Sequence, residues 1–320
     1  TGVAARAERP ALGTRFDDRS SSSWQPGYSW NFPATKLVHV DIDPQELGRN
    51  YAPTLGLIAD VKVFTRQLLN ALAQRGLTDE RYAPWRTQVQ GWQREWEAFV
   101  RPHFGDSTSP LLPEFADGTL QKTLPDDVIL SLDSGVHHNW FMQFWKPKRP
   151  QSMLNSWGYS SMGFGVCGAL GAQLAAPDRP CVAVVGDGGF TMAPYVLCTA
   201  VEYNLPVVWI IWNNFAWGAI RDLQYGLFDG REIGTAFYKG QTGERYNPDF
   251  AAWARACGAD GVTVTRSQDL GHAVEQAIRN RRPCVIDVHV DAEVRPPSTG
   301  TWQLPPIPYK EPVYGKPYLA

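Results

Sequence analysis

Five short apolar runs that alternate with stretches of helical spacing constrain the fold more than any other feature of this chain. Several of the runs are continuous and bounded by turns, which is typical of parallel strands buried on both faces. The expected strands span residues 127–132, 181–185, 207–212, 261–264 and 284–290, and the expected helices span 163–176, 193–203, 248–257 and 269–280. This alternation predicts an α/β fold with a doubly wound parallel sheet.

The N-terminal segment has the pattern of a second, smaller α/β unit. Residues 36–43 alternate as a strand that ends in carboxylates, residues 57–60 indicate another short strand, and residues 61–73 have helical spacing. Residues 1–11 are rich in Ala and Arg and are not expected to form a first strand. We therefore expect residues 1–75 to be part of a middle α/β domain, with the rest of its sheet outside the chain.

Composition suggests how the remaining residues are organised. Residues 76–115 are predicted to be a helical linker, because a charged, Trp-bearing stretch gives way to Pro, Gly, Ser and Thr. Residues 116–292 hold the doubly wound unit. Residues 293–320 carry many Pro and Tyr residues without periodicity, so we expect an extended C-terminal tail.

Charge and hydropathy exclude several classes of protein. The net charge of −2 leaves no basic surface for nucleic acid or an anionic membrane. No apolar run reaches the ~18 residues of a transmembrane helix, and the first residues lack a signal-peptide core. The five cysteines are scattered and mostly within apolar runs, which suggests buried free thiols in a reducing compartment. We therefore expect a cytoplasmic protein.

Two of the expected strands end in residues suited to binding a phosphate group through a metal ion. One runs into Gly186-Asp187-Gly188-Gly189, and the next runs into Asn213-Asn214. Ligands of open parallel sheets bind at the carboxyl ends of strands, so both segments reach one site if the strands are neighbours. Asp187 and Asn214 offer the oxygen ligands that Mg²⁺ prefers, and the glycines let backbone N–H groups approach phosphates.

Each segment also has a purely structural interpretation, since Gly-Asp-Gly-Gly is a common turn and Asn-Asn a common strand exit. A Rossmann dinucleotide site is a further alternative, but Thr191 stands where the third glycine of the G-x-G-x-x-G fingerprint belongs. The two segments together, with 24 residues between Gly188 and Asn213, resemble the signature of thiamine-diphosphate-dependent enzymes.

The resemblance covers most of the chain and narrows the family further. Residues 13–19, 133–140, 155–165 and 199–206 are similar to segments of the large catalytic subunit of acetolactate synthases and their carboligase relatives. This resemblance implies that the protein binds thiamine diphosphate and Mg²⁺. It also implies a substrate such as a 2-oxo acid or an acyloin, which is cleaved, joined or decarboxylated.

The resemblance implies roles for individual residues. Asp187 and Asn214 would bind the metal through their side chains, and Ala216 through its carbonyl oxygen. Met162 would have a catalytic role by supporting the bent cofactor, with plain core filling as the alternative; for His137 the alternative is a solvated loop. The residues expected around the cofactor are Gly135, His137, Met162, Gly186, Gly188, Gly189, Asn214, Trp217 and Gly218.

The family also has a pyrimidine-binding domain with a catalytic glutamate, which no segment before residue 120 resembles. The resemblance therefore implies a partner, either a separate chain or another fragment, that supplies this domain. We expect a hetero-oligomer, and no turnover from residues 1–320 alone. Some relatives hold FAD in a region that residues 13–19 resemble in part, which raises FAD as a second cofactor.

Two departures from the family pattern bear on the substrate. Leu223 stands where acetolactate synthases have a tryptophan that selects the second ketoacid, and Val136 replaces a polar residue expected beside the diphosphate. Residues 215–219 are closer to relatives of the sulfoacetaldehyde acetyltransferase type. Three hypotheses compete: a carboligase, lyase or decarboxylase; a non-catalytic subunit that binds the cofactor to stabilise or regulate a partner; and a nicotinamide dehydrogenase.

Overall fold

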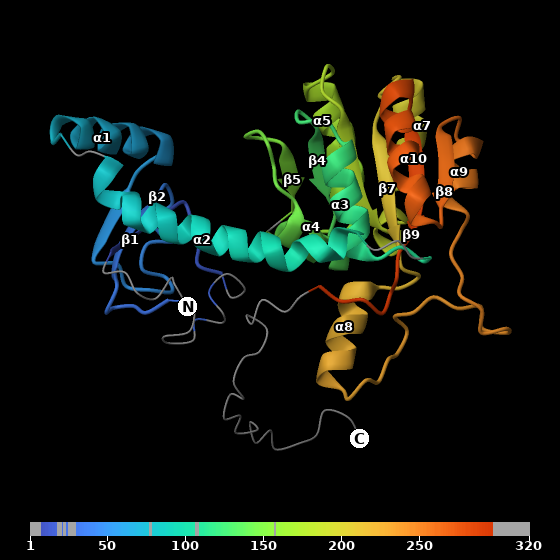
Figure 1. Ribbon diagram of the computed structural model, residues 1–320, viewed down its shortest axis with the longest axis horizontal. Helices are drawn as coiled ribbons and strands as arrows, with labels where there is room; N and C mark the ends of the chain where they lie inside the picture. Colours follow the sequence, from blue (N-terminus) through green and yellow to red (C-terminus); the bar gives the residue numbers. More distant parts are fainter. Residues whose placement is uncertain are drawn as a thin grey trace. The chain divides into compact units, whose positions relative to one another are not determined.

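The computed structural model describes residues 8–17, 21, 24, 30–76, 79–105, 109–156 and 158–296 (Figure 1). These fall into two compact units, one up to Gln88 and one from Val89 to Pro296. The expected tail lies outside the described residues from residue 297 onward. Within the described part, no helix combines the length and the apolar character needed to cross a bilayer.

The smaller unit contains a parallel sheet in the order β1-β2-β3, formed by Glu8–Leu12, Lys36–Asp41 and Leu55–Ile58. The expectation that residues 1–11 form no strand is wrong for β1. Its five backbone positions pair with β2 from Glu8–Lys36 to Leu12–Val40, and this pairing outweighs a weak strand propensity. β1 lies at an edge of this sheet, where a proline such as Pro10 is tolerated.

Helices follow this sheet in the order the sequence predicts. α1 (Val61–Gln74) begins after Asp60, whose carboxylate accepts a hydrogen bond from the Val63 N–H at 2.9 Å and so caps the helix. After the short helix η2 (Asp79–Tyr82), α2 (Ala83–Val100) and η3 (Arg101–Gly105) complete the predicted helical stretch.

The larger unit is built on six parallel strands in the order β5-β4-β6-β7-β9-β8. All five predicted strands are present, and β5 is an additional short one. The strands are β4 (Ile129–Leu132), β5 (Met153–Asn155), β6 (Cys181–Gly186), β7 (Val208–Asn213), β8 (Asp260–Val264) and β9 (Cys284–His289).

Helices cover both faces of this sheet, which confirms the doubly wound prediction. Alternate strand residues divide between two cores: Val182 and Val184 pack with residues of α3, α4 and α10, whereas Ala183 and Val185 pack with residues of α5, α7 and α9. The helices are α3 (Pro113–Thr123), α4 (Val136–Phe144), α5 (Phe164–Ala175), α7 (Val196–Glu202), α9 (Phe250–Ala256) and α10 (Ser267–Asn280).

The strand order places a binding crevice at one edge of the sheet. The chain passes from β4 outward to β5 and then back across β4 to β6, so the direction of winding changes between β4 and β6. Such a switch opens a crevice at the carboxyl ends of the strands. Two further helices, α6 (Asp187–Phe190) and α8 (Gly218–Leu227), follow β6 and β7 at this edge.

All five cysteines are free, as predicted, but the expectation that they are buried is wrong for three of them, since Cys257 is partly exposed and two others are exposed. Cys181 and Cys284 lie in buried strands, whereas Cys167 and Cys198 are exposed on α5 and α7. An apolar sequence neighbourhood does not bury every position of a helix, because a helix that covers a sheet turns only one side toward it.

Asp117 on α3 should make the stability of the fold depend on pH. Its carboxyl group is fully buried and has no hydrogen-bond partner among the described residues, and burial raises its pKa well above the usual range. The unfolded chain therefore loses this proton first as pH rises. Between pH 4 and the folded pKa, each pH unit lowers the free energy of unfolding by up to about 1.4 kcal/mol.

We expect Asp117→Asn to remove this pH dependence. We compare the free energies of unfolding of the variant and the wild type in urea. The variant's advantage over the wild type should be larger at pH 8 than at pH 5, because the amide has no charged form to bury. Asp178→Asn, in an exposed turn, is the matched control and should show no such gain. Parallel stability curves for Asp117→Asn and the wild type would contradict the prediction.

Candidate functional site

A cavity of about 110 Å³ lies at the carboxyl ends of β4, β6 and β7. In Figure 1 this edge is the one at which α8 lies, below the sheet. All the residues that the sequence assigned to the cofactor or the metal line this one cavity: Gly135, His137, Met162, Gly186, Asp187, Gly188, Gly189, Asn214, Ala216, Trp217 and Gly218. The fold therefore brings together segments that lie far apart in the sequence.

Asp187 supplies a buried carboxylate directly after β6. Its Oδ1 accepts a hydrogen bond from the Gly188 N–H at 2.9 Å, and its Oδ2 accepts one from Asn247 Nδ2 at 2.7 Å. Burial raises the pKa of Asp187 to about 6, against the opposing effect of these bonds and of the Phe215 and Ala216 N–H groups. The side chain is therefore largely ionised at neutral pH, as a cation ligand must be.

The two asparagines at the end of β7 have different environments. Asn213 is tied to the next strand, since its Nδ2 donates to Asp287 Oδ1 at 2.9 Å and its Oδ1 accepts from Asn247 Nδ2 at 2.7 Å. Asn214 lines the cavity, and its Oδ1 accepts from the Ala216 N–H at 3.2 Å. Phe215, between them and Ala216, has a left-handed backbone conformation (φ 57°). Asn214 is thus the asparagine placed to reach a ligand.

Two of the glycines let chain segments approach closely around the cavity. A Cβ on Gly188 would lie 2.2 Å from Cζ3 of Trp217. A Cβ on Gly218 would lie 2.5 Å from Nδ2 of Asn214. Real Cβ atoms are not found at such distances, so these positions form a cradle that a larger residue would fill.

Asp133 organises the cavity, although the sequence assigned it no role. It follows β4, and its two carboxylate oxygens accept from the Gly163 N–H at 3.0 Å and the Gly165 N–H at 3.1 Å. Burial raises the pKa of this carboxyl group, and the backbone bonds partly oppose the rise. Asp133 thereby holds the segment that carries Met162, whose side chain is 38% exposed and so does not fill a core.

His137 on α4 lines the cavity and has an unpaired ring nitrogen. The side chain is 1% exposed, so the solvated-loop interpretation is wrong, and Nε2 has no hydrogen-bond partner among the described residues. Burial, with a smaller effect from His138, lowers its pKa to about 3, while the ring keeps a hydrogen bond to the backbone of Asp133. An anionic oxygen at Nε2 would favour the protonated ring, which donates from both nitrogens. The residues present therefore fit a phosphate group.

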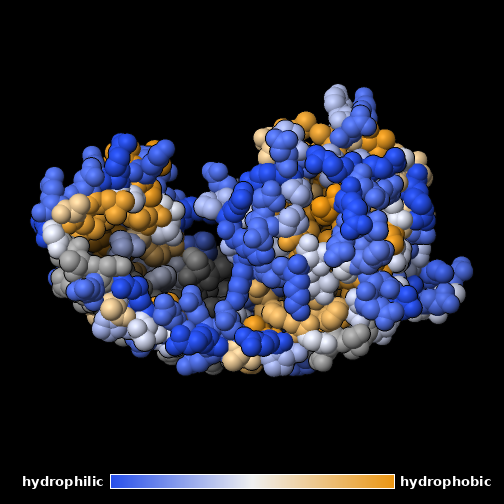
Figure 2. All heavy atoms as spheres, turned by 45° about the horizontal axis from the view of Figure 1, so that its top comes forward, coloured by the Kyte–Doolittle hydropathy of each residue, from blue (hydrophilic) through white to orange (hydrophobic). Residues whose placement is uncertain are grey.

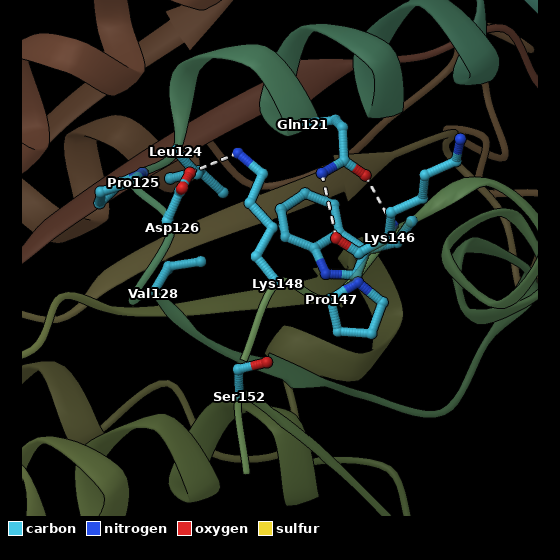
Figure 3. A pocket seen from close by; sticks show the side chains of 10 residues that line it. Gln121, Leu124, Pro125, Asp126, Val128, Lys146, Pro147, Lys148 and Ser152 are labelled. Atoms are coloured by element: carbon cyan, nitrogen blue, oxygen red, sulfur yellow. Dashed lines mark hydrogen bonds and ion pairs between the residues drawn. The ribbon is translucent and has the colours of Figure 1, made fainter. Parts of the chain in front are cut away.

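A second hollow in this unit, at the amino-terminal end of β4, has a different character (Figure 3). Its volume is about 10 Å³. The polar side chains around it bind one another: Gln121 exchanges hydrogen bonds with the backbone of Lys146, and Lys148 pairs with Asp126. His137, with its unpaired buried nitrogen, and Asp187, with its buried carboxylate, line instead the cavity at the carboxyl ends of the strands.

The chain matches two known protein families. Residues 133–288 match the family described as thiamine pyrophosphate enzyme, C-terminal TPP binding domain. Residues 11–68 match thiamine pyrophosphate enzyme, central domain. The chain belongs to the thiamine pyrophosphate enzymes. The match to the binding domain begins at Asp133 and includes both strand-end segments around the cavity, which confirms the family that the motifs indicate.

Curated relatives among the thiamine pyrophosphate enzymes are about one-third identical to this chain over the aligned residues. "Putative thiamine pyrophosphate-containing protein YdaP" of Bacillus subtilis is 33% identical over 83% of this chain and 44% of its own length. The acetolactate synthase large subunit of Corynebacterium glutamicum is 32% identical over 89% of this chain and 45% of its own length. The acetolactate synthase large subunit of Parasynechococcus marenigrum is 31% identical over 88% of this chain and 43% of its own length. The chain thus spans less than half the length of these relatives.

Three residues that support the site were assigned no role from the sequence: Asp133, Asn247 and Asp287. Asp133 stands at the start of a segment similar to the family, and this was the one available signal for its importance. Asn247 and Asp287 lie in no recognisable motif and reach the site only through the fold, by contacts over 60 and 74 residues of sequence.

Proposed function

We propose that this chain is the Mg²⁺- and diphosphate-binding part of an enzyme that cleaves, joins or decarboxylates bonds next to a carbonyl carbon, in the manner of acetolactate synthases and carboligases. One observation carries the proposal: three residues line one cavity at the switch point of the sheet, namely Asp187 with its buried carboxylate, Asn214 with its amide oxygen and His137 with an unpaired ring nitrogen. Bound thiamine diphosphate supplies the electron sink for such carbon chemistry.

The residues of this chain would position the cofactor and exclude water around it. Asp187 and Asn214 would hold Mg²⁺ with their side-chain oxygens and Ala216 with its carbonyl oxygen, which leaves positions for phosphate oxygens and water. The diphosphate would lie against His137 and the glycine backbone of residues 186–189. Met162, partly exposed at the cavity, would support the bent cofactor.

A partner with a pyrimidine-binding domain is part of the proposal. Two observations support it: the curated relatives are more than twice as long as the matched region, and the smaller unit exposes much apolar surface. α1 has no buried residue, and Ile58 and Leu69 are 66% and 60% exposed. Figure 2 shows apolar atoms gathered on this unit. Surfaces of this kind mark contacts with further polypeptide.

Two narrower points complete the proposal. The compartment we propose is the cytoplasm, because all five cysteines are free. FAD is not included, since neither the described residues nor the comparisons support it. Leu223 on α8 is 44% exposed and smaller than tryptophan, which argues against acetolactate formation. Residues 215–219, which are closer to relatives of the sulfoacetaldehyde acetyltransferase type, favour such an acyl transferase as the alternative within the same chemistry.

Calorimetry on the full chain tests the proposal. Thiamine diphosphate should bind with Mg²⁺ present and not after chelation of the metal, and NAD should not bind. Turnover of a 2-oxo acid such as pyruvate should appear only when the chain is combined with a polypeptide that carries the pyrimidine-binding domain. Binding without turnover in that complex would favour the non-catalytic subunit, and absence of Mg²⁺-dependent binding would overturn the assignment.

Removing the side chain of Asn247 should weaken Mg²⁺ binding without unfolding the protein. Its Nδ2 donates to both Asp187 and Asn213 at 2.7 Å, so Asn247→Ala leaves the metal-binding carboxylate poorly oriented. Partners of metal ligands typically contribute about 10–100-fold in affinity, and we expect a loss in that range in a Mg²⁺ titration at fixed thiamine diphosphate. Asn280→Ala, at the exposed end of α10, should leave the titration unchanged.

A further inference from the structure

The segment after α8 returns to the cofactor cavity and pairs with the residues that follow β7. We call residues 230–237 the strap. Ala236 forms an antiparallel bridge with Ala216, the Trp217 N–H donates to the Thr235 carbonyl at 2.8 Å, and the Phe237 N–H donates to the Phe215 carbonyl at 2.8 Å. The strap therefore fixes the backbone of residues 215–217.

This pairing turns the polar groups of Ala216 away from the strap. The two hydrogen bonds come from the residues on either side of the bridge, so Ala216 and Ala236 form a non-hydrogen-bonded pair, in which each residue's own N–H and C=O point outward. The Ala216 N–H accordingly donates to Asn214 Oδ1. The carbonyl oxygen of Ala216 is the group proposed above as a ligand of Mg²⁺, so the strap determines where that ligand points.

An ion pair connects the strap to α8. Arg221 Nε donates to Glu232 Oε2 at 3.1 Å, and the other oxygen of Glu232 accepts from the hydroxyl of Thr235 at 3.0 Å. Thr235 is the residue whose carbonyl accepts from Trp217. A continuous series of hydrogen bonds therefore runs from Arg221 through the strap to the residue next to Ala216.

Arg221 is anchored on its other side by the segment after β9. Its Nη1 donates to the Ala292 carbonyl at 3.0 Å and its Nη2 to Glu293 Oε1 at 2.6 Å, and the guanidinium lies 5.0 Å from the ring centre of Tyr225. The side chain is 9% exposed. A buried guanidinium is stable only when its donors are satisfied, so loss of its partners would displace it. Arg221 is thus a fixed point to which the strap is attached.

We propose that Arg221 and Glu232 are positioning residues for the metal site, which hold the strap so that the Ala216 carbonyl stays directed into the cavity. This inference rests on the proposed function and adds to it a device, remote from the cofactor, that controls Mg²⁺ affinity. Neither side chain lines the cavity, so their effect passes through the strap.

A Mg²⁺ titration of the full chain at saturating thiamine diphosphate tests the inference. Arg221→Met keeps the length of the side chain and removes its donors, and it should weaken Mg²⁺ binding by about 10–100-fold, as for other partners of metal ligands. Arg221→Lys should recover part of the loss, because a single charged donor can still reach Glu232. Glu232→Gln keeps its shape and loses the charge, and it should give an intermediate loss.

Arg179→Met is the control for a loss of an arginine side chain that only destabilises the fold. Arg179 Nε donates to the Asp127 carbonyl at 2.8 Å near the amino end of the sheet, so its loss should lower stability in urea without changing the Mg²⁺ titration. A folded Arg221→Met with wild-type Mg²⁺ affinity would overturn the inference. Should that variant not fold, unchanged affinity in Glu232→Gln would overturn it. Failure of the wild-type chain to bind with Mg²⁺ would instead remove the proposed function, and this inference with it.

Discussion

Replacing Asp187 with alanine should abolish Mg²⁺-dependent binding of thiamine diphosphate. Among the described residues that line the cavity, Asp187 is the only acid, so the variant leaves an amide and a carbonyl oxygen to hold the metal. Affinity for cations such as Mg²⁺ depends on ligand charge. We expect the apparent affinity to fall by at least about 100-fold, more than for a residue that only orients a ligand. Calorimetry with and without Mg²⁺ measures this loss directly.

Stability measurements separate lost metal binding from lost structure. Burial raises the pKa of Asp187 to about 6, so the folded protein bears a cost for its charge at pH 8 that the unfolded chain does not. Asp187→Asn removes the charge, and the metal-free variant should therefore unfold in urea no more easily than the wild type at pH 8. Asp178→Ala, in an exposed turn, should alter neither property. Unchanged Mg²⁺-dependent binding in Asp187→Ala would show that the metal is held elsewhere.

The parts of the fold that the sequence predicts are those with strong local patterns. β6 and β7 are buried on both faces, so each leaves a continuous apolar run that is visible without any structure. β5 has three residues, too few to show a period. β1 contains a proline and forms through pairing with β2. Elements whose stability comes mainly from tertiary contacts were the ones missed.

The residues of the site also fall into two groups, those that the sequence could predict and those that it could not. Asp187 and Asn214 could be found because each directly follows a recognisable strand, and parallel strands bring their carboxyl ends to one edge. The sequence could not show that Asn247 orients Asp187, since that bond depends on how the segment before α9 folds over the sheet. Nor could it show that His137 is buried with an unpaired nitrogen, which requires the packing of α4.

Gly188→Ala should disrupt the cofactor site, because it adds a Cβ atom where two chain segments approach closely. The added Cβ would lie 2.2 Å from Cζ3 and 2.5 Å from Cε3 of Trp217. The indole cannot move freely, because its ring packs edge-on against Phe237 at 5.3 Å, on the strap. Relief of the clash must shift the backbone beside Ala216. We expect a stability loss of about 1–3 kcal/mol, typical of overpacking, and a loss of Mg²⁺-dependent thiamine diphosphate binding larger than this destabilisation explains.

Gly171→Ala is the matched control, since a Cβ there meets nothing within 4 Å on the exposed side of α5. It should raise stability by up to about 1 kcal/mol, because alanine favours helix over glycine, and leave cofactor binding unchanged. Gly188 is not among the residues with positive φ, so its backbone conformation suits alanine. A loss of binding in Gly188→Ala therefore reports on the space beside Trp217, whereas wild-type binding would mean that this close approach is not part of the site.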